Sequence, residues 1–153
     1  FLADRRPRAW NQWPEISWRD PRSPGHLGDV PHSWIGAEYV LAVLAMLAYE
    51  SPGEDALVLA AGVRDEWLDG EGVRVEGLPT WWGPVGYRLS RDGPNALRLD
   101  LAPGLSLPPG GIVLRPPLPR PLASVEADGT PLASFDAASA TLRALPSRVT
   151  LRF

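Results

Sequence analysis

Tryptophans and carboxylates gather in one stretch of the chain, residues 10–34, and their side chains are suited to binding a sugar. The stretch contains both histidines, the carboxylates Glu15, Asp20 and Asp29, and the tryptophans Trp10, Trp13, Trp18 and Trp34. Indole faces stack on the C–H surfaces of sugar rings. Two carboxylates can hydrogen-bond hydroxyls and act as acid and base in glycoside hydrolysis. We therefore predict that this stretch binds carbohydrate, through Trp10, Trp13, Trp18, His32 and Trp34.

A structural explanation of the same residues stays open. Tryptophan and proline side chains often hold a long loop against a helical core, and residues 1–28 are rich in both. Asp29 also stands where its carboxylate can accept the free N–H groups at the start of a helix.

A second aromatic group, Trp81 and Trp82, lies between two β-like runs, in the segment 80–84. It is predicted either to bind sugar on the face of a β-domain or to fill a contact between domains or the core at a strand start. The structural alternative is favoured, because the apolar helix described below and the tryptophan-rich loop both need a packing partner.

Several kinds of chemistry are not indicated. His26 and His32 are six residues apart, a spacing that matches no standard zinc pattern, and the chain has no cysteine. No G-x-S-x-G motif is present. The formal net charge is -3 and no arginine-rich run alternates with aromatics, which argues against nucleic acid as a partner. We predict no metal and no cofactor.

Residues 30–49 are almost unbroken apolar sequence and predict one helix over about 31–50, ended by Ser51, Pro52 and Gly53. Asp29 is predicted to cap this helix, with Pro31 in its first turn. Because the helix is apolar on nearly every face, it has to be buried on several sides, by neighbours that this chain does not supply. Its apolar part is shorter than the roughly 20 residues that span a bilayer and includes Glu38, so we predict no membrane contact.

After residue 51 the pattern changes to short alternating runs separated by Gly, Pro and Asp. They predict seven or eight strands about ten residues apart, typical of an antiparallel β-sandwich. Asp128-Gly129 and the segment 91–95 are predicted hairpin turns. The predicted fold is therefore mainly β, a sandwich over 51–153, preceded over 1–50 by a Trp/Pro-rich loop and one long buried helix.

The order of these parts resembles a known family. Residues 28–39, GDVPHSWIGAEY, look like the last barrel helix of glycoside hydrolases built on an (α/α)6 toroid, the six-hairpin glycosidases. Segments 78–84, 111–117, 124–129 and 145–146 are similar to the antiparallel β-sandwich that follows the barrel in that family.

The resemblance implies a parent enzyme that hydrolyses or phosphorolyses a glycosidic bond. Loops between barrel helices line the cleft in such families, which makes Glu15 the first candidate for a catalytic carboxylate, followed by Asp29 and Asp20. A toroid needs about twelve helices and only one is visible here, so the resemblance implies a C-terminal part that is inactive alone, with the helical barrel of the parent protein as its partner.

Two alternatives remain at this stage. One is a stand-alone carbohydrate-binding sandwich. The other is a non-catalytic interaction domain that associates with itself or with another protein through the apolar helix.

Overall fold

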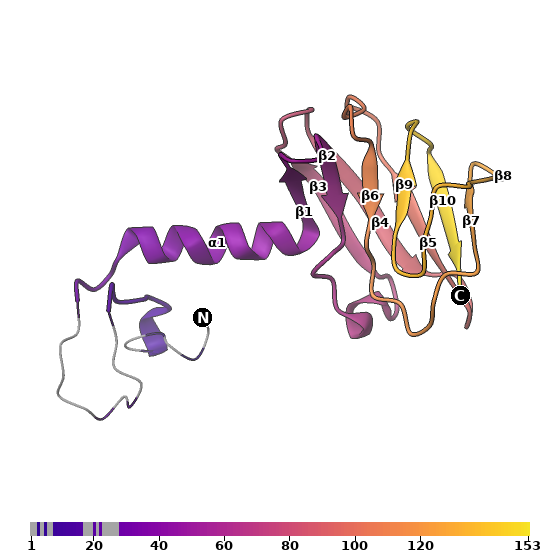
Figure 1. Ribbon diagram of the computed structural model, residues 1–153. Helices are drawn as coiled ribbons and strands as arrows, with labels where there is room; N and C mark the ends of the chain where they lie inside the picture. Colours follow the sequence, from indigo (N-terminus) through magenta and orange to yellow (C-terminus); the bar gives the residue numbers. More distant parts are fainter. Residues whose placement is uncertain (1–2, 4, 6–7, 17–19, 21, 23–27) are drawn as a thin grey trace. The chain divides into compact units, whose positions relative to one another are not determined.

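The computed structural model describes residues 3, 5, 8–16, 20, 22 and 28–153 and divides the chain into two compact units, residues 1–44 and 45–153. Helix α1 (Ser33–Leu47) belongs to both units, and the ten strands all lie in the second (Figure 1). Trp18 and His26 lie outside the described residues.

In the first unit, two chain segments run side by side before α1 begins. The Glu15 N–H donates to the Asp29 carbonyl at 3.0 Å, and the Gly28 N–H donates to Ile16 at 3.2 Å. The His32 N–H donates to the Trp13 carbonyl at 2.9 Å. A short 3-10 turn, η2 (Arg8–Trp10), precedes these segments. The tryptophan-rich loop is thus tied by its backbone to the residues that lead into α1.

Helix α1 is shorter than predicted at both ends. It begins at Ser33, and the Gly36 N–H donates to the His32 carbonyl at 3.2 Å. Asp29 is therefore too early in the chain to cap it, and the cis-peptide residue Pro31 precedes it instead of lying in its first turn. These two predictions are wrong because the backbone of residues 28–32 pairs with residues 13–16 before the helix can start.

The helix ends at Leu47 and not at residue 50, because the last three predicted helical residues form a strand. The Leu47 carbonyl accepts hydrogen bonds from the Ala60 N–H at 2.9 Å and from the Tyr87 hydroxyl at 2.8 Å. The next residues, β1 (Ala48–Ser51), pair antiparallel with β2 (Ala56–Leu59). The predicted domain division after residue 50 therefore falls inside β1.

No residue of α1 is buried in the structure as described. Val40 is 53% exposed, Leu41 58% and Val43 39%. Successive residues of a helix are turned by about 100°, so Val40 and Val43 point to one side and Leu41 to another. The burial predicted for this helix is not found in the part of the chain that the structure describes.

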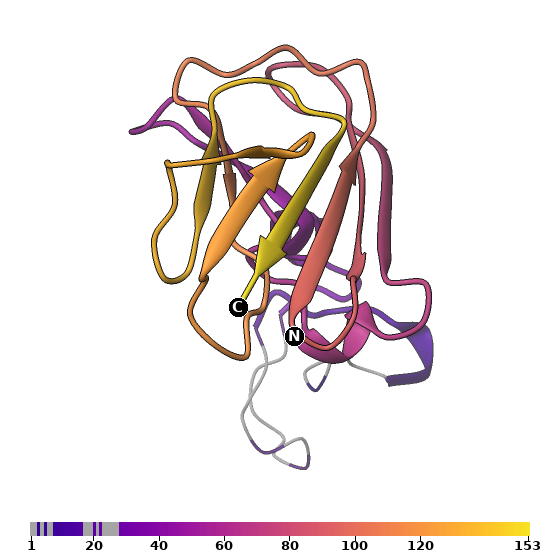
Figure 2. The same ribbon diagram turned by 90° about the vertical axis from the view of Figure 1, so that its right-hand side faces the viewer.

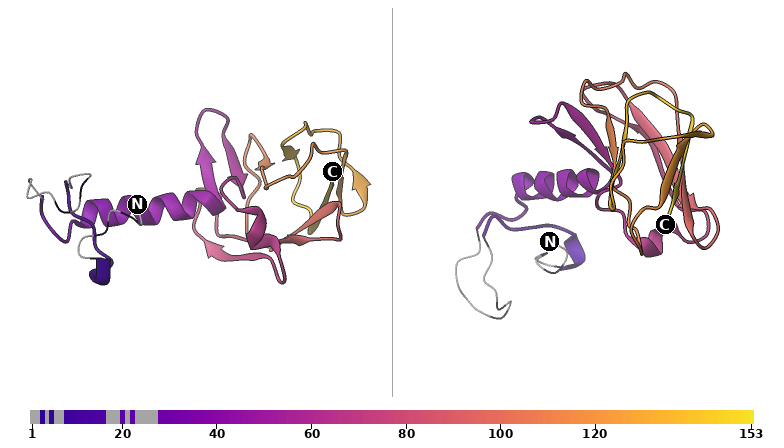
Figure 3. Two further views of the ribbon diagram at one scale, coloured as in Figure 1. Left: turned by 90° about the horizontal axis from the view of Figure 1, so that it is seen from below. Right: turned by 45° about the vertical axis from the view of Figure 1, so that its right-hand side comes forward.

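The second unit is mainly β and consists of two sheets (Figures 2 and 3). The four-stranded sheet has the order β1-β2-β6-β9, with β6 (Ile112–Leu114) and β9 (Ala140–Leu142). The six-stranded sheet has the order β3-β4-β5-β10-β7-β8. Its strands are β3 (Val73–Leu78), β4 (Val85–Arg91), β5 (Ala96–Leu101), β7 (Ser124–Ala127), β8 (Thr130–Pro131) and β10 (Arg148–Arg152).

This arrangement corrects two predictions. The described residues form ten strands and not seven or eight, because β1, β8 and β9 carry no clear alternating pattern. The neighbours β2 and β6 run parallel, whereas all other paired strands are antiparallel. A parallel pair needs a long connection, and here the segment between the two strands contains β3, β4 and β5.

One hydrophobic core joins the two sheets. Leu57, Leu59 and Leu114 from the smaller sheet belong to the same cluster as Leu99 and Leu151 from the larger one. Each of these side chains is at most 1% exposed. Alternate residues of each strand point to opposite faces, so the intervening positions of the larger sheet form its outer face.

The predicted turns are confirmed. Asp128 and Gly129 connect β7 to β8, and both have positive φ (46° and 79°), as a two-residue hairpin requires. The turn predicted over 91–95 is formed by residues 92–95 between β4 and β5, where the Asp92 N–H donates to the Ala96 carbonyl at 2.9 Å.

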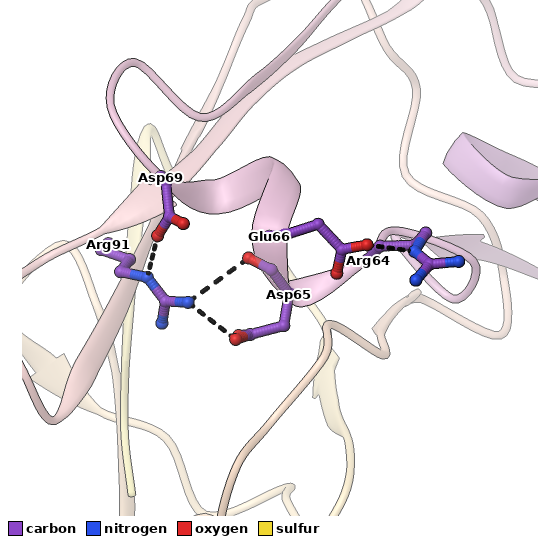
Figure 4. Close-up of polar contacts among 5 residues, drawn as sticks. All are labelled: Arg64, Asp65, Glu66, Asp69 and Arg91. Carbon is purple, nitrogen blue, oxygen red and sulfur yellow. Dashed lines mark hydrogen bonds and ion pairs between the residues drawn. The ribbon is translucent and has the colours of Figure 1, made fainter.

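A short 3-10 turn, η3 (Asp65–Leu68), lies between β2 and β3. Arg91 at the end of β4 holds it through Nε to Asp69 Oδ1 at 2.9 Å and through Nη2 to Asp65 Oδ2 at 2.8 Å (Figure 4). Leu68 is fully buried below. The ion pairs therefore fix the turn while its leucine completes the core.

We expect Leu99→Ala to lower the free energy of unfolding by about 2–5 kcal/mol, because it removes a buried side chain between the sheets and leaves a cavity. The exposed Leu107 is a matched control, and Leu107→Ala should cost about 0.5 kcal/mol or less. Urea unfolding followed by circular dichroism measures both. Equal losses of unfolding free energy in Leu99→Ala and Leu107→Ala would contradict the placement of Leu99 in the core between the sheets.

The Asp128 carboxyl is expected to make the free energy of unfolding depend on pH. A hydrogen bond from the Ser147 hydroxyl, and then those from the backbone N–H groups of Ser147 and Arg148, hold the pKa of this carboxyl below its ordinary 3.8. A lowered folded-state pKa stabilises the fold above the unfolded-state pKa, and this contribution is lost as the pH falls through the folded value. The free energy of unfolding should therefore decline below about pH 4.

Asp128→Asn should be less stable than the wild type at pH 7 and should show a shallower decline in acid. Asp92→Asn is the control, because the Asp92 carboxylate is exposed and accepts no hydrogen bond from any described residue. Unfolding curves between pH 2 and 7 test this. Parallel pH profiles for wild type and Asp128→Asn would show that the carboxylate plays no such role.

Candidate functional site

The structure brings the two predicted catalytic carboxylates, Glu15 and Asp29, onto neighbouring segments of the first unit. Their residues are joined by the backbone hydrogen bond from Glu15 to Asp29, and both residues are exposed. Gly28 is buried beneath Glu15: a Cβ at residue 28 would lie 2.8 Å from the Glu15 Cβ and 3.0 Å from its Oε2. Only a residue without a side chain allows this approach.

Exposure limits what these carboxylates can do in this chain. A carboxylic acid that donates its proton to a leaving group needs dry surroundings, which keep it protonated near neutral pH. The side chains of Glu15 and Asp29 face solvent. Acid–base catalysis at this position would require further protein groups to cover them.

The predicted sugar-binding tryptophans of the first unit differ in their environments. Trp13 is only 9% exposed and stacks on Tyr39, with ring centroids 4.7 Å apart and an angle of 28° between the planes. Its ring thus holds the loop to α1, which favours the structural explanation. Trp10 is 64% exposed and Trp34 is 70% exposed, so most of each indole is open to a ligand.

His32 occupies the position just before α1 and is half-buried. Its Nδ1 is buried and has no hydrogen-bond partner among the described residues. The Trp34 Nε1 donates to Glu38 Oε1 at 3.3 Å, one turn further along the helix. The start of α1 therefore has one exposed indole, and one buried imidazole nitrogen that has no hydrogen-bond partner among the described residues.

The second aromatic group lies in the connection between β3 and β4, and its two rings have different roles. Trp82 packs against the main core, and its carbonyl accepts the Ser106 N–H at 2.8 Å. Trp81 is 68% exposed, and its backbone N–H donates to Glu50 Oε1 at 3.0 Å. The rings are tilted by 57° with centroids 5.9 Å apart. Trp82 thus fits the structural explanation, whereas Trp81 offers a free face.

One hollow was missed by sequence reasoning. It has a volume of about 530 Å³ and lies on the outer face of the six-stranded sheet, lined by charged, apolar and glycine residues of β3, β4, β5 and the segments next to them. The charged side chains are Arg74, Glu76, Arg88 and Asp100. The alternating pattern of each strand is visible in the sequence, but only the strand register places these charged residues side by side.

Other site types are not found among residues 3, 5, 8–16, 20, 22 and 28–153. No three side chains of the kinds that bind metals lie together there. In the same residues, no helix is both long and apolar enough to cross a bilayer.

Comparisons with known proteins identified no relative. No family model, no curated protein and no solved structure matched the chain.

Proposed function

We propose that this chain is the C-terminal part of a glycoside hydrolase-like protein of the toroid type and is inactive alone. In this proposal the loop with Glu15 and Asp29 lines a carbohydrate-binding cleft. Helix α1 is the last helix of the barrel, and the two sheets form the structural sandwich that follows it. The observation that carries the proposal is the apolar surface of α1, none of whose residues is buried.

That surface indicates the kind of partner. Between Ser33 and Leu47 the only charged residue is Glu38, and the exposed apolar side chains point to more than one side of the helix. A helix that is apolar all round is stable in water only when it is covered. Neighbouring helices on more than one side, as in a helical barrel, would provide that cover.

The loop before the helix supports a role in a cleft. Its backbone pairing places Glu15 and Asp29 on adjacent segments, next to the buried Gly28. Trp10 and Trp34 each expose most of an indole. Carboxylates and open aromatic faces within one loop are a combination that binds and cleaves sugars.

A stand-alone carbohydrate-binding module is the second candidate, and the exposed Trp81 favours it. In that case the isolated chain would bind a neutral oligosaccharide, and Trp81→Ala would abolish binding. Trp67→Ala is the matched control, since Trp67 is 41% exposed on η3. Equal binding by wild type and Trp81→Ala would eliminate this site.

We expect the isolated chain to show no turnover of aryl glycosides or oligosaccharides and to self-associate through α1. Leu41→Glu should weaken the association at least about tenfold. It places a charge on the apolar surface and removes a leucine side chain that the association would bury. Sedimentation velocity over a concentration series measures the association, and a chromogenic glycoside assay measures turnover.

Leu107→Glu is the control for the charge change, because Leu107 is an exposed leucine of the β-unit. It should associate like the wild type. A wild-type chain that stays monomeric at all concentrations, or that cleaves glycosides by itself, would overturn the proposal. So would an equal loss of association in the two variants.

A further inference from the structure

The hollow on the outer face of the six-stranded sheet is formed by residues without bulk. Gly86 of β4 is buried at the sheet surface, and a Cβ there would lie 3.1 Å from the Ala102 Cβ. Gly77 has φ +61° and lies where the register of β3 against β4 shifts. The two glycines open space between the side chains of β3, β4 and β5 that line the hollow.

The strand register sets two arginines opposite each other at this hollow. Arg74 of β3 faces Arg88 of β4, and Arg88 faces Asp100 of β5. Like charges directly opposite on one sheet face destabilise the pairing of strands. An anion between the two guanidinium groups would remove this repulsion.

Existing ion pairs do not neutralise Arg88. Asp100 is already shared by Arg98 at 2.8 Å and Arg148 at 3.0 Å, and Arg74 is paired with Glu76 on its own strand. Toward the residues that the structure describes, the Arg88 side chain donates only through Nε, to the backbone carbonyl of Glu71 at 2.9 Å. Among the described residues, no carboxylate forms an ion pair with Arg88. Its terminal N–H groups are therefore available to a ligand.

The face as a whole has more positive than negative side chains, although the chain carries a net charge of -3. Its arginines outnumber its carboxylates. The outward-pointing arginines of the strands are Arg74, Arg88, Arg98, Arg148 and Arg152, and the carboxylates are Glu76, Asp100 and Glu126. The excess of positive charge is thus local to this face, whereas the lining of the hollow itself has two arginines and two carboxylates.

We propose that the hollow binds an acidic sugar. The sugar's carboxylate or sulfate group lies between Arg74 and Arg88, and its hydroxyls donate to Glu76 and Asp100. A guanidinium group presents paired N–H donors that match a carboxylate or sulfate in geometry. The ligand class deepens the proposed function and rests on it, because the sugar is inferred from the carbohydrate-active parent. The anion site itself rests on the arginines alone.

Nuclear magnetic resonance titration of the ¹⁵N-labelled chain tests the proposal at constant ionic strength. Three ligands are compared: sodium glucuronate, glucose and sodium sulfate. Glucuronate should shift the amide signals of Gly86 and Ala102 and the Nε signal of Arg88 in a saturable way. Glucose and sulfate should each bind at least about tenfold more weakly than glucuronate. Glucose has no anionic group to contact the arginines, and sulfate has no hydroxyl groups to donate to the carboxylates.

Arg88→Gln should weaken glucuronate binding about tenfold or more, and Arg74→Gln provides an independent second variant. Arg152→Gln is the matched control, because Arg152 lies on the same face outside the hollow and pairs with Glu126 at 2.9 Å. It should bind like the wild type. The amide spectra of all three variants report whether the fold is retained.

The absence of saturable shifts with glucuronate would overturn the proposal, as would equal binding of glucose or an equal loss in Arg152→Gln. Equal affinity for sulfate and glucuronate would reduce the site to one for free anions and overturn the assignment of an acidic sugar. These signals report on the β-unit only. Failure here therefore leaves the proposed barrel role of α1 standing, and failure of that role leaves these shifts unchanged.

Discussion

The proposed function depends on the apolar surface of α1 and on the need to keep that surface from water. Fifteen residues with a single charge form this helix, and none of them is buried. Roughly 25 cal/mol is gained for each Å² of apolar surface removed from water, so a helix of this composition strongly favours contact with other apolar surfaces. The tryptophan-rich loop covers a small part of this surface, because the ring of Trp13 stacks on the ring of Tyr39 in α1.

The β-unit, in contrast, satisfies its own requirements. Its two sheets share one core, and the ends of its elements are fixed by specific groups. Arg91 holds η3, Asp128 holds the residues at the start of β10, and Tyr87 donates to the last carbonyl of α1. The chain thus combines a unit that has its own core with a helix none of whose residues is buried. This contrast is what a structural domain next to a helical barrel would require.

Sequence patterns predicted those parts of the fold that are determined by neighbouring residues. Strict alternation located β3, β4 and β5, and Asp128-Gly129 predicted its hairpin because few residue pairs accept positive φ twice. Residues 48–50 are predicted to be helical because they directly continue the apolar run of α1, whereas pairing with β2 decides their structure. The parallel contact of β2 with β6 joins segments far apart in the sequence, which no local pattern can reveal.

The candidate sites show the same division. Residue types identified Glu15, Asp29 and the tryptophans, but only the structure separates Trp13 and Trp82, which pack internally, from the exposed Trp10, Trp34 and Trp81. The hollow between Arg74 and Arg88 depends on register and on two glycines, so the sequence of each strand alone could not predict it.

The most direct test is an experimental structure of the natural polypeptide in which these 153 residues occur, with the solvent exposure of Val40, Leu41 and Val43 as the measured quantity. We predict that all three side chains are buried against helices from outside residues 1–153. Finding them open to solvent, or covered by the chain's own sheets, would contradict the assignment of α1 to a larger helical assembly.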